Sequence, residues 1–362
     1  MTTLKYIDAF SGLGGFGICA SRVAKEINIG SECVASIEFD KNCRLTYEMN
    51  FGHPQTHNDI TTVDPGSFPI HNLLMGGFPC QPFSRNGKFY NKNDKTLGDD
   101  DRKNLVNYLL GILEVKQPEF FLFENVKELT TIKNTDGTSC FNTILSNIRE
   151  IGYEVDWKVL DAKDYGLPQQ RKRIYIVGRR GTGNDMFIWP EKIHKSPTPC
   201  VLDILEKDVA DRYLVESVWR KRKNMKKPGY KWESMVELYN SGKWKNPSSP
   251  TGKIEPLAIL YGDTPSGGPR QQDKLYSVMG ISPTIATIPL SIPAFDTPQG
   301  WRQLTPRECA RLQGYPDSYI LPEKDSIAYK QVGNSIALNV VMKIISNILL
   351  PEKIEGVMHG FC

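Results

Sequence analysis

The sequence predicts an α/β protein in which a mostly parallel sheet carries helices on both faces, with a second, smaller domain that is irregular and partly β. Strand-like and helix-like segments alternate over residues 1 to about 180, which is the order of a parallel sheet with crossover helices. Between residues 181 and 305 helical periodicity fades, while Pro, Gly, Ser, Lys and Trp become frequent. An apolar helical segment returns near the C-terminus.

The predicted strands are apolar or β-rich runs that end at glycine, proline or polar residues. They cover residues 5–10, 33–39, 72–75, 119–123, 153–160 and 173–178. The predicted helices carry apolar residues at three- and four-residue spacing. In the N-terminal half they cover residues 15–27, 43–50, 103–116 and 139–151.

Two further helices are predicted in the C-terminal part. One begins at Thr305, because a capping threonine, a proline at the next position and Glu308 form a capping box. The other covers residues 335–349 and is apolar along one side, for example at Val340 and Ile344. Such a helix needs a surface to cover, and we expect that surface to be the N-terminal sheet.

Length and composition are those of a soluble globular protein. The chain has 362 residues, of which 40% are hydrophobic and 24% charged. No apolar run approaches the roughly 18 residues of a membrane span, and the N-terminus enters a strand pattern at once, so we expect no targeting segment. The eight cysteines form no CxxC pair and there are only five histidines. We therefore expect free thiols in a reducing cytosol and no zinc site.

The net charge is mildly positive, at +4, and one basic cluster stands out. Seven basic residues gather between Trp219 and Trp232, with Tyr230 among them. They are Arg220, Lys221, Arg222, Lys223, Lys226, Lys227 and Lys231. Basic residues mixed with aromatic ones favour a nucleic-acid-binding surface, and a solvated charged face is the alternative.

A glycine-rich turn follows the first predicted strand. Residues 12–17 match G-x-G-x-x-G, and Glu38 ends the next strand 21 residues after Gly17. This pattern is typical of adenosine-containing ligands, because the glycines let the backbone approach and the carboxylate accepts from ribose hydroxyls. Phe10 and the doubled Gly14-Gly15 favour S-adenosylmethionine, which carries no pyrophosphate. The alternatives are a nicotinamide or flavin enzyme, or glycines that serve a tight turn only.

Cys80 stands where a nucleophile would be placed. It lies in the run GGFPCQPFS over residues 76–84, directly after the predicted strand at 72–75. Pro79 and Pro82 bracket the cysteine and stiffen the loop, since each proline fixes its own φ and restricts the residue before it. A thiol on such a loop is presented at a strand end. The alternative is a buried free cysteine, a common state in intracellular proteins.

Four more sequence blocks follow in order along the chain. They are FENV at residues 123–126, QQRKR at 169–173, RQLTPRECARLQGYP at 302–316 and QVGNS at 331–335. With DAFSGLGGFG at residues 8–17 and GGFPCQPFS, they make the chain resemble the cytosine-5 DNA methyltransferases over essentially its full length. The long variable gap before the LQGYP block is also characteristic of that family. Six blocks in one order are far more specific than any single one of them.

The resemblance implies a catalytic set of five residues. Cys80 would attack carbon-6 of cytosine as a thiolate, so that carbon-5 can take a methyl group. Glu124 would hold and protonate ring nitrogen 3 of the base. Arg171 would reach the base carbonyl, with Arg173 and Gln169 supporting the loop. For Arg173, a plain salt-bridge role is the alternative.

The resemblance also implies the ligands, with no metal among them. S-adenosyl-L-methionine, converted to S-adenosyl-L-homocysteine, would contact residues from several blocks. These are Phe10, Gly12, Leu13, Gly14, Glu38, Asp59, Ile60, Pro79, Asn104, Leu105, Asn334 and Ser335. Double-stranded DNA would contact Ser84, Arg85, Lys88, Arg220, Arg222, Lys226 and Thr284. The target cytosine would be flipped out of the duplex, under a lid formed by the loop after Cys80.

For the whole enzyme, the resemblance implies a Rossmann-like, S-adenosylmethionine-dependent catalytic domain of residues 1–188 and 318–362. Residues 189–317 would form the target-recognition domain. It further implies a monomeric, cytoplasmic, prokaryotic DNA (cytosine-5-)-methyltransferase of the restriction-modification type, with no membrane partner.

Two alternatives share the fold. One is a tRNA cytosine-5 methyltransferase, whose recognition domain carries a Cys-Phe-Thr element. The nearest match here is Cys140-Phe141-Asn142, which lacks the threonine and lies outside the expected recognition domain. The other is a DNA-binding relative without activity, which should have lost Cys80 or Glu124; both residues are present.

Overall fold

The computed structural model describes residues 1–79, 105–133, 137–181, 187–193, 196–215, 247–259 and 270–350. The chain divides into two compact units. The first comprises Met1–Leu160, Lys172–Glu191 and Val340–Cys362, and the second comprises Asp161–Arg171 and Lys192–Asn339. These limits differ from the domain limits expected from the sequence, and the predicted division by function stays a prediction.

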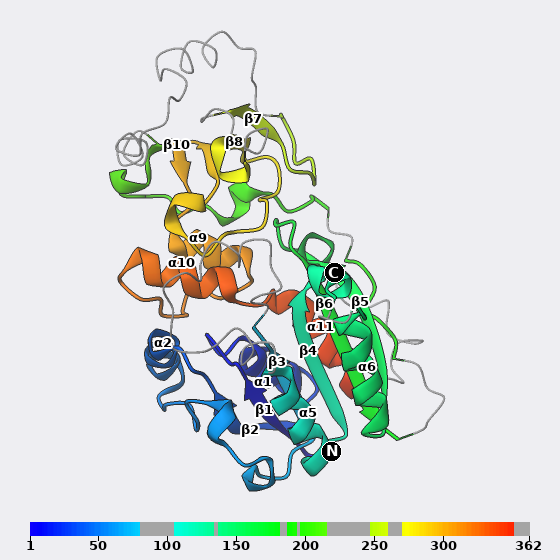
Figure 1. Cartoon of the computed structure of the whole chain (residues 1–362). Helices are drawn as coiled ribbons and strands as arrows, with labels where there is room; N and C mark the ends of the chain where they lie inside the picture. Colours follow the sequence, from blue (N-terminus) through cyan, green and yellow to red (C-terminus); the bar gives the residue numbers. More distant parts are fainter. Residues whose placement is uncertain are drawn as a thin grey trace. The chain divides into compact units, whose positions relative to one another are not determined.

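The first unit is built on a six-stranded sheet (Figure 1). Its strands are β1 (Thr3–Ala9), β2 (Gly30–Ile37), β3 (Leu73–Gly77), β4 (Phe120–Val126), β5 (Tyr153–Asp161) and β6 (Lys172–Arg180). Their order across the sheet is β2-β1-β3-β4-β6-β5. β1 is parallel to β2 and β3, and β3 is parallel to β4, whereas β6 runs antiparallel to β4. The predicted α/β fold with a mostly parallel sheet is confirmed.

Every helix predicted from apolar spacing is present, with ends shifted by at most three residues. The helices are α1 (Gly15–Glu26), α2 (Lys41–Phe51), α5 (Leu105–Lys116), α6 (Cys140–Glu150) and α11 (Leu338–Leu349). The 3₁₀ turns of this unit are η1 (Ile60–Thr62), η2 (Pro65–Ser67) and η3 (Lys127–Thr131). Helix α2 begins earlier than predicted because the Asp40 side chain accepts hydrogen bonds from the backbone of Asn42 and Cys43.

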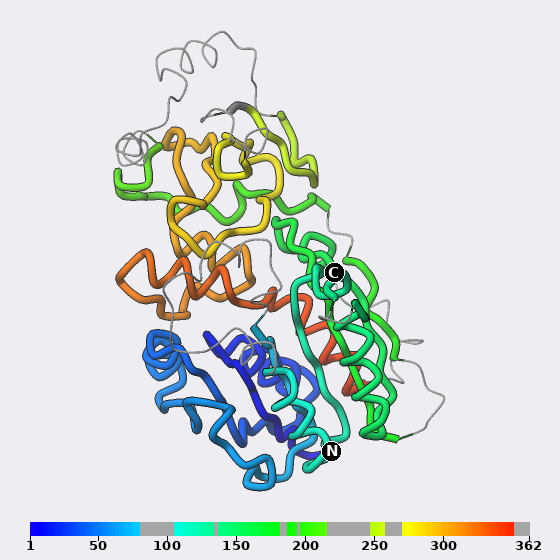
Figure 2. Tube along the Cα trace, in the orientation of Figure 1, coloured from blue at the N-terminus to red at the C-terminus, as the bar shows by residue number. Residues whose placement is uncertain are grey.

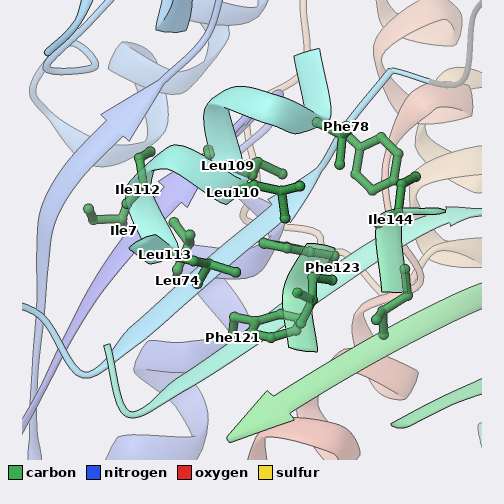
Figure 3. Packing of buried hydrophobic residues seen from close by; sticks show 14 of the residues in the cluster. Ile7, Leu74, Phe78, Leu109, Leu110, Ile112, Leu113, Phe121, Phe123 and Ile144 are labelled. Carbon is green, nitrogen blue, oxygen red and sulfur yellow. The ribbon is translucent and has the colours of Figure 1, made fainter. Parts of the chain in front are cut away.

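One face of the sheet carries a continuous apolar core (Figure 3). Successive strand residues point to opposite faces, so every second residue contributes to it. Ile7 of β1, Leu74 of β3 and Phe123 of β4 are fully buried on this face. Helices α5 and α6 supply the covering side chains, including the fully buried Leu109 and Leu113 of α5. The core therefore holds the central strands rigidly where their ends carry the predicted motifs.

The opposite face is covered by α1 and the C-terminal helix α11 (Figure 2). The Tyr6 hydroxyl on β1 donates a hydrogen bond to the Gly17 carbonyl oxygen of α1, at 3.4 Å. The Cys19 thiol of α1 lies against the backbone of Met342 on α11. Ile344 of α11 is fully buried. The apolar side of the last helix thus packs within the first unit, as its pattern predicts.

By length and hydropathy alone, the stretch Asp325–Leu349 could span a membrane. It consists of two helices, α10 (Asp325–Asn334) and α11, which are interrupted at Ser335. Within its most apolar window, 56% is buried inside the protein. Packing in a protein core accounts for the apolar character of this stretch.

The second unit is built on a four-stranded sheet in the order β10-β9-β8-β7. The strands are β7 (Pro256–Ile259), β8 (Lys274–Ser277), β9 (Ala294–Thr297) and β10 (Gly300–Gln303). The helices are α9 (Pro306–Leu312) and α10, and the 3₁₀ turns are η4 (Ala162–Tyr165), η5 (Val201–Ile204), η6 (Asp211–Tyr213), η7 (Gln271–Asp273) and η8 (Pro289–Ser291). Short strands joined by turns match the irregular, partly β domain expected from the composition.

Helix α9 begins as predicted. The Thr305 hydroxyl accepts from the Glu308 backbone N–H at 3.1 Å, and the Glu308 carboxylate accepts from the Thr305 N–H at 2.8 Å. This reciprocal pair is the predicted capping box. Helix α10 was not predicted, because its buried residues, such as Ala328 and Val332, are followed by Gly333 and show only a short apolar period.

We expect Gly178→Ala to destabilise the protein by about 2 kcal/mol, the usual cost of forcing an extra methyl group into a packed core. Gly178 on β6 pairs with Phe121 on β4, and an added Cβ would lie 1.9 Å from the Phe121 ring. Urea denaturation measures the free energy of unfolding.

Gly111→Ala is the matched control, because an added Cβ there meets only Pro65 at 3.6 Å. Alanine also has the higher helix propensity, so this variant should gain up to about 1 kcal/mol. Equal effects of the two substitutions would contradict the packing argument.

Candidate active site

The glycine-rich turn leaves the carboxyl end of β1 in a sharply bent conformation. Phe10 adopts a φ of 56°, which is strained for a residue with a side chain. Gly12 and Gly14 follow with φ values of 52° and 71°. A Cβ on Gly14 would lie 2.5 Å from the Phe51 ring. Gly14 therefore cannot be replaced without moving Phe51, whereas Gly12 has space around it and is constrained by its positive φ.

Glu38 is held against this turn from the end of β2. One carboxylate oxygen accepts from the Gly12 N–H at 2.8 Å, and the other accepts from the Asp40 N–H at 2.7 Å. Burial raises the pKa of the Glu38 carboxyl, and these two hydrogen bonds oppose that shift. The structure thus brings the predicted ribose ligand, Glu38, next to the predicted glycine loop.

The aromatic ring of Phe39 has no predicted role, yet it is 57% exposed directly after Glu38. A flat apolar ring beside Glu38, the residue predicted to bind ribose, is suited to stacking on an adenine. The signal in the sequence is the aromatic residue between Glu38 and Asp40.

The segment with Asp59 and Ile60 lies beside the end of β2. His57 forms a bridge with Ile37, and its carbonyl oxygen accepts from the Glu38 N–H at 3.2 Å. The Asp59 carboxylate accepts from the backbone and the hydroxyl of Thr61. The Ile60 side chain is buried in the apolar core, so only its backbone remains for a ligand. Leu13 is likewise buried.

Asp8 lies behind the glycine turn, on β1. It is 1% exposed, and one carboxyl oxygen accepts from the Gly17 N–H at 3.1 Å. The other oxygen has no hydrogen-bond partner among the described residues. Burial raises the pKa of the Asp8 carboxyl well above its ordinary value, and the nearby Glu38 adds to the shift. A neutral acid is the form that this environment favours.

Glu124 and Arg173 form an ion pair at the carboxyl end of the parallel strands, the end from which the glycine-rich turn leaves β1. Glu124 lies near the carboxyl end of β4, and Arg173 lies near the start of β6, which is antiparallel to β4. Arg173 Nε is 3.2 Å from Glu124 Oε1, and the two side chains are 15% and 11% exposed. Gly77, the partner of Glu124 on β3, leaves room for the carboxylate: a Cβ there would lie 3.6 Å from Glu124 Oε2.

The chain leaving β3 is anchored two residues before Cys80. The Asn125 side-chain amide donates to the Phe78 carbonyl oxygen at 3.2 Å. Phe78 is buried and packs edge-on against Phe123. Asn125 was given no role from the sequence, although a polar residue directly after Glu124 in an apolar strand is a usable signal. The described residues reach Pro79, which is partly exposed.

Arg171 and Gln169 belong to the second unit. The Arg171 guanidinium donates to the carbonyl oxygens of Gly333 and Ser335, at the end of α10. The Ser335 hydroxyl is hydrogen-bonded to the Tyr315 hydroxyl at 2.6 Å. Three of the six sequence blocks therefore meet around the Arg171 side chain.

The remaining predicted residues fall into two groups. Thr284 donates its hydroxyl hydrogen to the Gln170 carbonyl oxygen at 2.7 Å, Asn334 is exposed, and Leu105 begins α5. The others lie outside the described residues: Cys80, Ser84, Arg85, Lys88, Asn104, Arg220, Arg222 and Lys226. Within the part of the chain that the structure describes, no group of three or more His, Cys, Asp or Glu side chains could hold a metal ion.

Comparison with known proteins gives the family of the chain. The family model for C-5 cytosine-specific DNA methylase matches residues 4–350. The chain is 36% identical to the type II methyltransferase M.DsaV of Dactylococcopsis salina, over 96% of this chain and 86% of that protein. It is 35% identical to M.HhaI of Haemophilus parahaemolyticus, over 96% and 95%. The crystal structure of the S. pombe Dnmt2 methyltransferase superposes with a TM-score of 0.66 at 19% identity, covering 96% of this chain and 99% of that one.

The protein belongs to the C-5 cytosine-specific DNA methylases, and it is therefore a methyltransferase. The sequence-based recognition of the family and of the enzyme class is confirmed. The structural neighbour, at 19% identity, supports the fold alone.

We expect Asp8→Asn to stabilise the protein increasingly as the pH rises. The unfolded Asp8 carboxyl loses its proton near pH 4, while the native one keeps it because its pKa is raised. The native state then binds more protons than the unfolded state, so wild-type stability falls with rising pH. Asparagine does not titrate and still accepts from Gly17.

The difference in unfolding free energy between Asp8→Asn and wild type should grow by about 1.4 kcal/mol per pH unit from about pH 4 up to the native pKa. Denaturation curves at several pH values measure it, and Asp208→Asn, at an exposed position, is the control. A difference that stays constant with pH would contradict a neutral native Asp8.

Proposed function

We propose that this enzyme transfers a methyl group from S-adenosyl-L-methionine to carbon-5 of a cytosine within a specific double-stranded DNA sequence, as the modification enzyme of a restriction-modification system. The family match over residues 4–350 supports the reaction. The type II methyltransferases that it resembles support the biological setting. The observation that carries the proposal is the Glu124–Arg173 pair beside the strand end that leads to Cys80.

Cys80 is the proposed nucleophile. Carbon-5 of cytosine is too electron-poor to attack a methyl donor directly. When the Cys80 thiolate adds to carbon-6, the electron pair of the 5,6 double bond becomes available at carbon-5, which then forms the new bond to the methyl group. Loss of the carbon-5 proton restores the double bond and expels the thiolate. The thiol is thus regenerated in each cycle.

Glu124 is proposed to bind the base edge. Its carboxyl group would donate a proton to ring nitrogen 3 and accept from the exocyclic amine, so that negative charge does not accumulate on the ring during thiolate addition. Arg173 fixes the carboxyl group through the 3.2 Å ion pair.

The residues of the first unit fit S-adenosylmethionine. The Phe10–Gly14 turn is bent by positive φ values at Phe10, Gly12 and Gly14. Glu38 provides a carboxylate for ribose hydroxyls, and Phe39 provides an exposed ring. Asp59 lies on the adjacent segment. When bound, the cofactor supplies an electrophilic methyl group and leaves as S-adenosylhomocysteine.

The proposed substrate, double-stranded DNA, requires the enzyme to flip the target base and to bind the DNA backbone. A cytosine stacked in a duplex cannot reach a cysteine loop, so it must be flipped out at a cost of a few kcal/mol. Basic side chains, among them Arg85, Lys88 and Arg220, are proposed to supply phosphate contacts that offset this cost. We place the enzyme in the prokaryotic cytoplasm, acting as a monomer on the DNA of its own cell.

Expression in cells that lack cytosine methylation tests the proposal directly. Bisulfite sequencing of their DNA should reveal 5-methylcytosine at every copy of one short sequence. The same cells expressing Cys80→Ser provide the background. Unmodified DNA in cells that contain folded wild-type protein would contradict the proposed function, and methylated tRNA in its place would indicate the related RNA activity.

We expect Cys80→Ser to lower methyl transfer by at least about 1,000-fold, because loss of a nucleophile removes the covalent pathway. DNA binding should survive, since serine keeps the shape of the side chain. Transfer of labelled methyl groups to DNA measures the rate. DNA carrying 5-fluorocytosine, which cannot release a proton from carbon-5, should trap wild-type protein and not the variant.

Cys140→Ser is the matched control, since Cys140 begins α6, is partly exposed and has no proposed role in the reaction. It should retain both activity and trapping. A trapped adduct with Cys80→Ser, or none with wild type, would exclude the covalent mechanism.

A further inference from the structure

Two fully buried glutamines in the second unit, Gln169 and Gln313, form a chain of hydrogen bonds that runs in one direction. The Ile285 backbone N–H donates to Gln169 Oε1 at 3.2 Å. Gln169 Nε2 donates to the Leu312 carbonyl oxygen at 3.0 Å and to Gln313 Oε1 at 3.3 Å. Gln313 Nε2 donates to the Val332 carbonyl oxygen at 3.2 Å.

The chemistry of the partners fixes the orientation of both amides. Each amide oxygen faces an N–H group, and each amide nitrogen faces a carbonyl oxygen. Rotating either amide by half a turn would set donor against donor and acceptor against acceptor. Both side chains are 0% exposed, so water cannot repair such a mismatch. The two glutamines therefore have one permitted arrangement.

The first end of this chain lies in the segment that carries Thr284. Residues 168–170 and 282–285 run side by side: the Ser282 N–H donates to the Pro168 carbonyl oxygen, and the Gln170 N–H donates to the Ser282 carbonyl oxygen, each at 2.8 Å. The Thr284 hydroxyl donates to the Gln170 carbonyl oxygen. The loop before Arg171 is thus bound to this segment through both backbone and side chains.

The other end lies in the last turn of α10, where Arg171 is also held. Val332 accepts from Gln313, and the next carbonyl group along, that of Gly333, accepts from Arg171 at 3.2 Å. Gly333 has no room for a side chain, because a Cβ would lie 2.7 Å from the Ala286 carbonyl oxygen. The carbonyl groups that hold Arg171 are therefore placed by Gln313 on one side and by the chain after Ile285 on the other.

We infer that Gln313, acting through Gln169, is a positioning residue for Arg171 and couples it to the Ser282–Ile285 segment. Gln313 fixes the last turn of α10, whose carbonyl groups orient the Arg171 guanidinium. Gln169 fixes the backbone two residues before Arg171. The inference rests on the proposed role of Arg171 at the flipped cytosine.

Gln313→Glu tests this with a pH-dependent signal. An ionised carboxylate would face the Val332 carbonyl oxygen with no hydrogen to donate, whereas the protonated acid could donate as the amide does. Burial raises the pKa of a carboxyl group, so the protonated form becomes the main one as the pH falls. Relative to wild type at the same pH, kcat should be about tenfold lower at pH 8.5 and should recover towards pH 6. The dissociation constants for DNA and cofactor should stay unchanged.

Two companion variants separate positioning from general damage. Gln313→Met keeps the volume and cannot titrate, so its loss of kcat should be equal at both pH values. Gln303→Glu places a carboxyl group at another buried glutamine of this unit, whose amide donates to the Pro289 and Ile292 carbonyl oxygens. It should leave kcat of the folded enzyme unchanged at both pH values. Circular dichroism at each pH gives the folded fraction.

Wild-type kcat in folded Gln313→Glu and Gln313→Met would overturn the inference. It would also be overturned if Gln303→Glu showed the same pH-dependent loss, because the effect would then be general. Arg171→Lys is assayed in parallel: wild-type kcat in that variant would refute the proposed role of Arg171 separately, whatever Gln313 does. Recovery at low pH in Gln313→Glu alone would support the coupling.

Discussion

The parallel pairing of β2, β1, β3 and β4 is the constraint on which the site of the first unit depends. Parallel neighbours all end at the same edge of the sheet. Glu38 follows β2, the glycine turn follows β1, the Cys80 loop follows β3, and Glu124 lies near the end of β4. The glycine turn, Glu38 and Glu124, up to 112 residues apart in the sequence, are therefore all brought to the carboxyl end of the parallel strands. The apolar core beneath them keeps this edge rigid.

The antiparallel strand β6 completes that edge for a different reason. Because β6 runs against β4, it is the start of β6 that lies beside the end of β4, and this brings Arg173 next to Glu124. A parallel β6 would carry Arg173 to the opposite edge. The ion pair thus depends on strand direction. It also requires the Glu124 and Arg173 side chains to lie on the same face of the sheet. The register provides this: Val126 pairs with Arg173 and Glu124 pairs with Tyr175, and residues two apart on a strand share a face.

The sequence could predict whatever depends on local pattern. Apolar periodicity located the strands and helices of the first unit. The capping box located the start of α9, because its interacting groups lie within a few residues of one another in the sequence. The direction of β6 and the hydrogen-bond partners of Asn125 and Gln169 could not be predicted. Asn125 acts on a carbonyl group 47 residues away, and Gln169 on a side chain 144 residues away. Such contacts exist only once the chain has folded.

Beside its short four-stranded sheet, the second unit stabilises an irregular backbone with long polar side chains. Turns and loops leave buried carbonyl groups that regular structure does not satisfy, and each one is costly if unpaired. Gln303 donates to two such groups, Arg307 to the carbonyls of Pro316 and Tyr319, and Gln271 to that of Thr284. The fully buried Arg302–Glu308 pair, with two contacts of 2.7 Å, follows the same logic.

Buried polar networks of this kind add little net stability compared with apolar packing, but they tolerate few alternative arrangements. For the proposed role of this unit in DNA recognition, a single arrangement of the side chains is of more use than a deeper free-energy minimum. Buried side-chain donors of the same kind, Gln169 and Gln313, reach the Leu312 and Val332 carbonyl oxygens, and Val332 directly precedes the Gly333 carbonyl group that accepts from Arg171. The irregular backbone of the second unit and the position of Arg171 therefore both depend on buried hydrogen bonds from side chains to carbonyl groups.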